Sequence, residues 1–275
     1  MAVFSKSRFV FALVLMLAPL WLSAQSVITE VSGIDDEMRA NVRASLSLAQ
    51  AEDLEQVSVW RLRQMARDAR EEVRLALEPF GFYSANVSVR LEEPKDDGAA
   101  WRARVQIEPG EPVMVDLAEV SVSEPAGSLE AFREWRKQWP LPKGSRLRHR
   151  PYEEALSELE QIAEAHGFFE ARFARRAIRV DPDRNQAKIH VDYAAGSRYV
   201  IGEIDYGDSG FNEGLMRAQT IVESGSPYLS GDLDRQREVL VRTGYFERVA
   251  VEQHRDAEAD QVNLTYNLER RPPNT

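Results

Sequence analysis

Three long segments carry apolar residues at the three-, four- and seven-residue spacing of one helical face. These residues are Leu62, Met65, Ala66, Ala69, Val73, Ala76 and Leu77, then Tyr152, Ala155, Leu156, Leu159, Ile162 and Ala163, and finally Leu233, Leu240 and Val241. Pro151 suits the first position of the second helix, and Asp232 can cap the third. Each segment therefore predicts a helix that lays one face on an apolar surface.

Two strands of alternating apolar and polar residues follow each predicted helix. Their apolar positions are Val87, Val89, Leu91, Trp101, Ala103, Val105 and Ile107, then Ile178, Val180, Ala187, Ile189, Val191 and Tyr193, and finally Val249, Val251, Val262, Leu264, Tyr266 and Leu268. Strict alternation predicts a sheet with one buried face and one wet face.

A further strand and a shorter helix precede each long helix. The strands are expected over 27–31, 113–122 and 199–206, and the shorter helices over 38–46, 129–139 and 211–216. Trp135 and Trp139 lie four residues apart, as residues on one helix face do, and are interpreted as core. The repeating unit is therefore β-α-α-β-β.

Each long helix ends in nearly the same phrase: "LEPFGFYSANV", "AEAHGFFEARF" and "LVRTGYFERVAV". The shared glycines are Gly81, Gly167 and Gly244, and the spacing between them is the length of a small domain. Glycine accepts the left-handed conformation that closes a helix, so these residues are predicted structural helix stops. Phe82 is expected to pack back on Leu77, and Tyr245 on Leu240. Pro79 is expected to end the first long helix early.

The repeat divides the chain into modules at 25–111, 112–196 and 197–268, with 269–275 remaining after the last strand. Residues 1–24 differ, because Lys6 and Arg8 precede the apolar run "FVFALVLMLAPLWL" and the small residues of "SAQ". This order is typical of a secretory signal peptide, with cleavage expected after Ala24. An uncleaved membrane anchor is the alternative.

Charge and cysteine content indicate the cellular compartment of the chain and the class of its partners. The 275 residues include 45 acidic and 35 basic residues, a net charge of −10, and no cysteine. A secreted chain without cysteine has neither disulfides nor a lipidated cysteine, which fits a bacterial periplasm best. The net charge argues against nucleic acid as a partner. Basic clusters over 146–150 and 172–176 are interpreted as solvated surface arginines.

A family resemblance rests on these features together. Tandem β-α-α-β-β units, a helix-ending Gly-aromatic pair, and an "EPG" or "AAG" turn at Gly110 or Gly196 resemble the polypeptide-transport-associated (POTRA) domain. So do the Gly-Ser entries to the long helices, "GSRLRHRPYEEAL" at Gly144 and "GSPYLSGDLDRQREVL" at Gly225. The resemblance covers nearly all of the mature chain. It is strongest to the branch of the outer-membrane protein assembly family that contains the outer-membrane subunit of the translocation and assembly module.

The resemblance implies an α+β fold of three tandem POTRA modules, each a small mixed sheet covered on one face by two helices. It implies a periplasmic location, with outer-membrane association in a full-length relative. The implied partners are unfolded outer-membrane proteins or autotransporters and an inner-membrane-anchored, TamB-like accessory subunit. In that family such modules hang below a membrane β-barrel and guide clients towards it.

The resemblance also implies a binding mode, because the second strand of each module lies at a sheet edge. An edge strand captures an extended polypeptide through main-chain hydrogen bonds. The implied edges are 86–91, 177–180 and 248–253. Their partner-binding residues are Val87, Val89, Ile178, Val249 and Val251. We favour the third edge, because the third module would sit nearest the barrel in a full-length relative and would hand the client over. Its sequence, "RVAVEQ", is short, alternates cleanly and contains no proline, so the edge stays available.

The chain departs from the family after Leu268, where only "ERRPPNT" remains and the family continues into barrel strands. The sequence is therefore a piece of a longer protein or a stand-alone periplasmic adaptor. Contact with the outer membrane through a barrel, and membrane insertion by this chain alone, are not expected from these residues. A stand-alone adaptor of the cell envelope remains an alternative function.

Enzymatic chemistry has weaker support. "GDSG" over 207–210 matches the residues around a protease nucleophile, which makes a periplasmic hydrolase using Ser209 the rival hypothesis. The four histidines, at positions 149, 166, 190 and 254, stand outside any recognisable base context. Metal-ligand spacings are absent from the sequence. We therefore expect a binding protein, with no catalytic residue, metal or cofactor.

Overall fold

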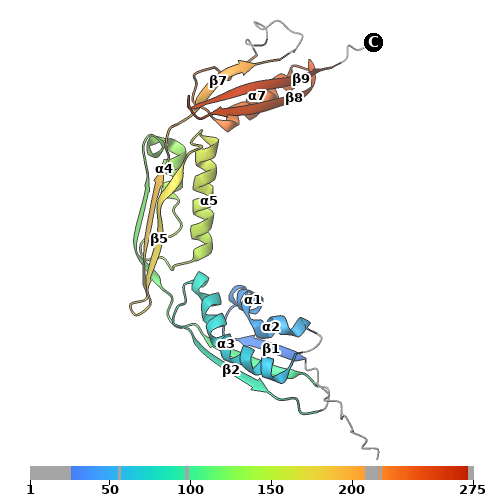
Figure 1. Cartoon of the computed structure of the whole chain (residues 1–275). Coiled ribbons are helices and arrows are strands. Elements are labelled where there is room, and N and C mark those ends of the chain that lie inside the picture. The colour runs from blue at the N-terminus through green and yellow to red at the C-terminus, as the bar shows by residue number, and fades with distance from the viewer. Residues whose placement is uncertain (1–25, 55–56, 97–98, 208–215, 217–218, 272–275) are drawn as a thin grey trace, which may run out of the picture. The chain divides into compact units, whose positions relative to one another are not determined.

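Figure 1 shows the computed structural model of the chain. The structure describes residues 26–54, 57–96, 99–207, 216 and 219–271. The chain divides into two compact units, Met1–Val73 with Val87–Ile107 and Arg74–Asn86 with Glu108–Thr275. The expected signal peptide, Ser209 and most of the expected 211–216 helix lie outside the described residues.

Module 1, which contains β1 to β3, follows the predicted order closely. Its elements are β1 (Val27–Ser32), α1 (Asp36–Ser45), α2 (Ser47–Gln50), α3 (Val59–Leu77), β2 (Asn86–Glu92) and β3 (Trp101–Glu108). Burial alternates residue by residue along β3, from buried Trp101 to exposed Glu108. One face of this sheet therefore forms the core and the other meets solvent.

Module 2, which contains β4 to β6, repeats this plan. Its elements are β4 (Met114–Val122), α4 (Glu130–Lys137), α5 (His149–Ala165), β5 (Arg172–Asp181) and β6 (Gln186–Ala194). Figure 1 shows α5 running alongside the sheet, with β5 labelled beside it. Trp135 is buried and its Nε1 donates to the carbonyl of Ala155 at 2.8 Å, so the predicted core position of Trp135 is confirmed.

Module 3, which contains β7 to β9, has β7 (Val200–Asp205), α7 (Ser230–Arg242), β8 (Phe246–Asp256) and β9 (Gln261–Arg270). Its core contains Leu233, Leu240 and Tyr266. Gln236 is fully buried on the same helix and is satisfied, because its Oε1 accepts from Ile221 N and its Nε2 donates to the carbonyl of Gln219.

The three sheets share one strand order: β1-β3-β2, β4-β6-β5 and β7-β9-β8. In each, the first strand runs parallel to the last, as in β4 with β6 and β7 with β9. The second strands β5 and β8 run antiparallel to β6 and β9. The predicted α+β fold of three small mixed sheets is confirmed.

The helix-ending glycines have positive φ in every module. Gly81 has φ 84, Gly167 has φ 82 and Gly244 has φ 73 degrees. All three values lie in the left-handed region that a side chain disfavours. The α-helix α3 ends at Leu77, and a 3₁₀ turn containing Pro79 carries the chain to Gly81. This early end agrees with the proline effect expected from the sequence.

Several details at the helix ends differ from the sequence predictions. Helix α7 begins at Ser230, so Asp232 lies in its first turn rather than at its cap, and Arg235 pairs with it there. Pro151 is likewise within the first turn of α5, which begins at His149. Val241 is half-exposed rather than buried. The buried stripe of α7 runs through Gln236 to Leu240, which turns Val241 away from the sheet.

The aromatic pair after Gly244 also differs from the prediction. Tyr245 is 53% exposed instead of packing on Leu240, and Phe246 enters the core in its place. In module 1, Phe82 is buried as expected, and its N–H donates to the carbonyl of Leu77. The sequence segments at Gly81 and Gly244 therefore end their helices in the same backbone conformation, but the first buries the first aromatic after the glycine and the other buries the second.

Candidate functional site

The second strand of each module lies at an edge of its sheet. The strand orders place β2, β5 and β8 at one end, each with a single strand neighbour. These strands contain the five predicted partner-binding residues: Val87 and Val89 in β2, Ile178 in β5, and Val249 and Val251 in β8. An edge strand presents backbone N–H and C=O groups that a further strand can use.

The predicted partner-binding side chains are largely taken up by packing within their own modules. Val87 and Val249 are buried at 5% and 9% exposure. Ile178 and Val251 are partly buried against the cores of modules 2 and 3. These side chains therefore hold their strands in place. A partner can reach the backbone of each strand and the side chains on its opposite face.

The open face of β8 carries charges that are largely paired within module 3. Arg248 lies 3.7 Å from Glu269, and Glu252 accepts a hydrogen bond from the Asn267 amide at 2.7 Å. His254 lies 3.9 Å from the same Glu252. These exposed contacts each contribute about 0–1 kcal/mol, so a partner strand could rearrange them at little cost.

Two of the helix-ending glycines, Gly81 and Gly167, have a second role that their backbone conformation alone does not explain. The carbonyl of Gly167 accepts from Tyr199 N at 2.9 Å, and that of Gly81 accepts from Val113 N at 2.8 Å. A Cβ at Gly167 would lie 3.0 Å from Tyr228 Cβ, and one at Gly81 would lie 2.3 Å from the carbonyl oxygen of Leu147. Each glycine thus ends a helix and admits a segment that follows later in the chain.

An aromatic cluster surrounds the Gly167 contact. The Phe169 ring lies 5.2 Å from the Tyr199 ring and 5.0 Å from the Tyr228 ring, both in edge-on geometry. The Arg255 guanidinium lies 3.8 Å above Phe169 and pairs with Glu164 at 3.1 Å. This cluster ties the end of α5 and the turn after it to β8 and to the residues that precede β7 and α7, by packing and cation–π contact.

A related set of contacts surrounds Gly81. Arg146 Nε donates to the carbonyl of Phe80 at 2.7 Å, and its guanidinium lies 4.3 Å from the Phe82 ring. The Tyr83 hydroxyl and His149 Nε2 are 2.9 Å apart. Burial and the nearby Glu78 carboxylate raise the pKa of Tyr83 to about 12. Sequence reasoning missed these pairs, although the second aromatic of "GFY" and "GFF", Tyr83 or Phe169, takes part in one or more contacts of each set.

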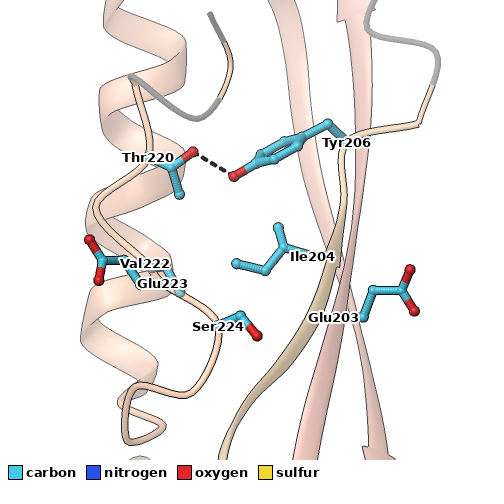
Figure 2. A pocket seen from close by; sticks show the side chains of 7 residues that line it. All are labelled: Glu203, Ile204, Tyr206, Thr220, Val222, Glu223 and Ser224. Atoms are coloured by element: carbon cyan, nitrogen blue, oxygen red, sulfur yellow. Dashed lines mark hydrogen bonds between the residues drawn. The ribbon is translucent and has the colours of Figure 1, made fainter. Parts of the chain in front are cut away.

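A hollow of about 510 Å³ lies in module 3 beside β7. Figure 2 shows Ile204 and the Tyr206 hydroxyl directed into it, with Tyr206 bonded to Thr220. Glu203, Val222, Glu223 and Ser224 complete the described lining. None of these described lining residues is a histidine, the usual base of a serine nucleophile.

Other catalytic and metal-binding arrangements find no support among the described residues. His149 and His166 lie at opposite ends of α5, His190 lies on β6 and His254 on β8, and each contacts a different partner. Within the described ranges, no group of three or more His, Cys, Asp or Glu side chains is placed to hold a metal. Every helix in that part of the chain is too short or too polar to span a membrane.

Comparison with known protein families gives a match to the first module. Residues 29–109, which span most of module 1, match the family model described as POTRA domain TamA domain 1. The first module matches a POTRA domain. Modules 2 and 3 repeat its strand order, so the chain has the fold of three tandem POTRA modules.

The solved structures that the chain matches have low sequence identity to it. POTRA3-5 of BamA from Haemophilus influenzae is 13% identical, with 90% of this chain and 96% of that chain covered and a TM-score of 0.42. The N-terminal domain of Omp85 from Thermosynechococcus elongatus is 16% identical, with 91% and 97% covered and a TM-score of 0.37. CdiB from Escherichia coli is 11% identical, with 88% and 37% covered and a TM-score of 0.36.

Proposed function

We propose that this chain is a periplasmic scaffold that binds extended polypeptide through its sheet edges, within an outer-membrane protein assembly or autotransporter secretion factor. The match of residues 29–109 to a TamA POTRA model supports the family context. The observation that carries the binding mode is the position of β2, β5 and β8, each at a sheet edge. Added strands gain main-chain hydrogen bonds there, and their alternate side chains give modest selectivity.

We place the main capture site on β8. It is the longest of the three edge strands, with 11 residues, and it contains no proline. Val249 and Val251 anchor it to the core of module 3, which keeps the strand extended without the help of a partner. A preformed edge lowers the ordering cost of binding, because only the client has to lose conformational freedom.

The partners that fit this proposal are unfolded outer-membrane proteins or autotransporters, whose alternating segments are already suited to strand pairing. A TamB-like accessory subunit anchored in the inner membrane is a second partner in the same proposal. The scaffold would work in the periplasm in association with the outer membrane. Its role is binding rather than catalysis.

Proline substitution tests this proposal, because consecutive residues of an edge strand direct their N–H groups to opposite sides. Ala250 and Val251 are consecutive, so one of the variants Ala250→Pro and Val251→Pro removes an N–H that is directed away from the sheet, and the other removes an N–H that bonds to β9. We call the first of these the outward variant. The outward variant should keep the wild-type melting temperature and bind an extended outer-membrane-protein peptide at least about tenfold more weakly.

Val251→Thr is the matched control, since it keeps the N–H and suits a strand. It should bind the peptide as wild type does. If the folded proline variant and Val251→Thr bind the peptide equally well, strand addition at β8 is excluded.

A further inference from the structure

Module 2 carries unpaired positive charge on the open face of its sheet. Arg172, Arg175 and Arg179 are exposed on β5, and Lys188 is exposed on the neighbouring strand β6. We call these four residues the basic strip. Within the part of the chain that the structure describes, none of the four has a hydrogen bond, ion pair or ring contact through its side chain.

The strand register places the basic strip on one face. On β6 the buried residues alternate with residues facing the other way, and Lys188 is one of the latter. Arg179 is the Cα partner of Lys188, Arg175 of Asp192 and Arg172 of Ala194, and the irregularity between Phe173 and Arg175 keeps the arginines in phase. All four cations therefore project from the face opposite the helix-covered core.

The acidic groups on the same face are already engaged. Asp192 accepts a hydrogen bond from the Ser121 hydroxyl at 2.8 Å, and Glu119 bonds to His190 at 2.8 Å. Neither carboxylate reaches the basic strip within ion-pair distance. Asp181, two residues beyond Arg179 on the same face, pairs with Arg184 at 3.8 Å. The four cations of the strip are thus without a carboxylate at ion-pair distance in the described residues, on a chain whose net charge is −10.

The equivalent face of module 1 shows that this is not a general property of the fold. There, Arg102 and Arg104 both pair with Glu30, at 2.8 and 3.2 Å, and Arg104 also pairs with Glu92 at 2.8 Å. In module 3, Arg248 pairs with Glu269. Module 2 alone among the three leaves most of the cations on its open sheet face without an acidic partner in the described residues.

Protection of the edge against aggregation does not account for the whole strip. Charged residues do guard edge strands, and Arg175 and Arg179 on β5 could serve that purpose. Lys188, however, lies on β6, which has a strand on each side and no open edge to guard. The positive charge therefore extends onto the sheet face, where it can only meet a ligand or solvent.

We propose that the β5 edge of module 2 selects extended polypeptide segments with acidic side chains on alternate positions. This inference rests on the proposed strand capture and adds a client preference to it. Arg175 and Arg179 are four residues apart, about 13 Å along a strand, so they face acidic residues with the same spacing on an added strand. Lys188, next to Arg179, adds a second cation for the carboxylate there. Arg172 and Arg175 of the "RFARR" cluster, interpreted from sequence as ordinary solvated arginines, are in this proposal part of a recognition surface.

Two peptides of roughly twelve residues test the preference. Both alternate threonine and valine, and one has glutamate and the other glutamine at two positions four apart. The full chain should bind the glutamate peptide about tenfold more tightly at low salt, since each exposed pair contributes up to about a fivefold gain. High salt should remove the difference.

The variant Arg175→Gln/Arg179→Gln should bind both peptides with the affinity that wild type shows for the glutamine peptide. Arg61→Gln/Arg70→Gln on α3 removes the same charge from exposed helix positions and should keep the wild-type discrimination. Wild type that binds both peptides equally at low salt overturns the acidic preference and leaves strand capture standing. Failure to bind either peptide overturns both proposals.

Vesicles separate this proposal from a membrane-binding role. Phosphatidylglycerol and phosphatidylcholine vesicles present an anionic and a neutral surface, respectively. The proposal expects the Arg175→Gln/Arg179→Gln variant to bind both vesicle types as wild type does. If the variant instead loses binding to the anionic vesicles while peptide discrimination is absent in wild type, the strip is a lipid-binding surface and the proposal is wrong.

Discussion

Modules 2 and 3 build the same sheet around edges of opposite character. Both have a parallel first and last strand and an antiparallel edge strand, β5 or β8. On β5 the open face carries unpaired arginines. On the open face of β8 the one arginine, Arg248, is paired with Glu269. The core positions thus specify the fold, and the open face is free to specify the partner.

The same two modules also differ at their helix-ending glycines. Gly167 is enclosed by Tyr228 and the carbonyl of Tyr199, while a Cβ at Gly244 would meet nothing within 4 Å. Both have positive φ, so both need glycine for conformation, but only Gly167 also needs it for space. The glycine of the repeated motif therefore always ends a helix in the left-handed conformation, and it makes room for a neighbouring segment only where one packs beside it.

The largest expected change in stability distinguishes the conformational role of these glycines from the spatial one. Gly167→Val should destabilise the protein by about 2–5 kcal/mol, because left-handed strain of about 1–2 kcal/mol adds to overpacking against Tyr228. Gly244→Val should cost only the strain of about 1–2 kcal/mol. Chemical denaturation followed by circular dichroism measures both values.

Gly231→Ala is the control, because Gly231 is in helix α7 with open space around it, and alanine favours a helix. Its stability should equal or slightly exceed that of wild type. Equal destabilisation by Gly167→Val and Gly244→Val would contradict the account of Tyr228 as a second constraint.

A smaller effect is expected at the arginines of β8. Arg255 lies over Phe169 and pairs with Glu164, so Arg255→Ala should cost about 1 kcal/mol. Arg248 has only an exposed pair with Glu269, so Arg248→Ala should have a smaller effect, close to the error of the measurement. A double-mutant cycle of Arg255→Ala with Phe169→Leu measures the coupling directly, and a coupling of zero would show that the cation–π contact contributes nothing.

Sequence patterns predicted the repeated fold well because its determinants are local. Alternation along 101–107 and 262–268 predicted the central strands. The helical stripes of α3 and α5 match the buried residues except at Met65, Ala66 and Ile162, which are partly buried. The stripe of α7 was harder, since its middle position is a buried glutamine with partners on a distant segment. A pattern based on apolar residues does not find such a position.

The edge chemistry could be predicted only in part. The edge strands followed from a family resemblance, whereas the open face of β5 depends on its pairing register with β6 and on an irregularity after Phe173. The contacts of Arg255 with Phe169 and Glu164 join residues far apart in the chain. Long-range pairs of this kind leave no periodic trace in a single sequence.

Amide hydrogen exchange along β8 tests the central claim most directly. With an extended outer-membrane-protein peptide bound, strand addition should slow exchange at alternate amides over 248–253, those directed away from β9, and leave the amides of β9 unchanged. Protection confined to the helices, or equal on β8 and β9, would contradict capture at this sheet edge.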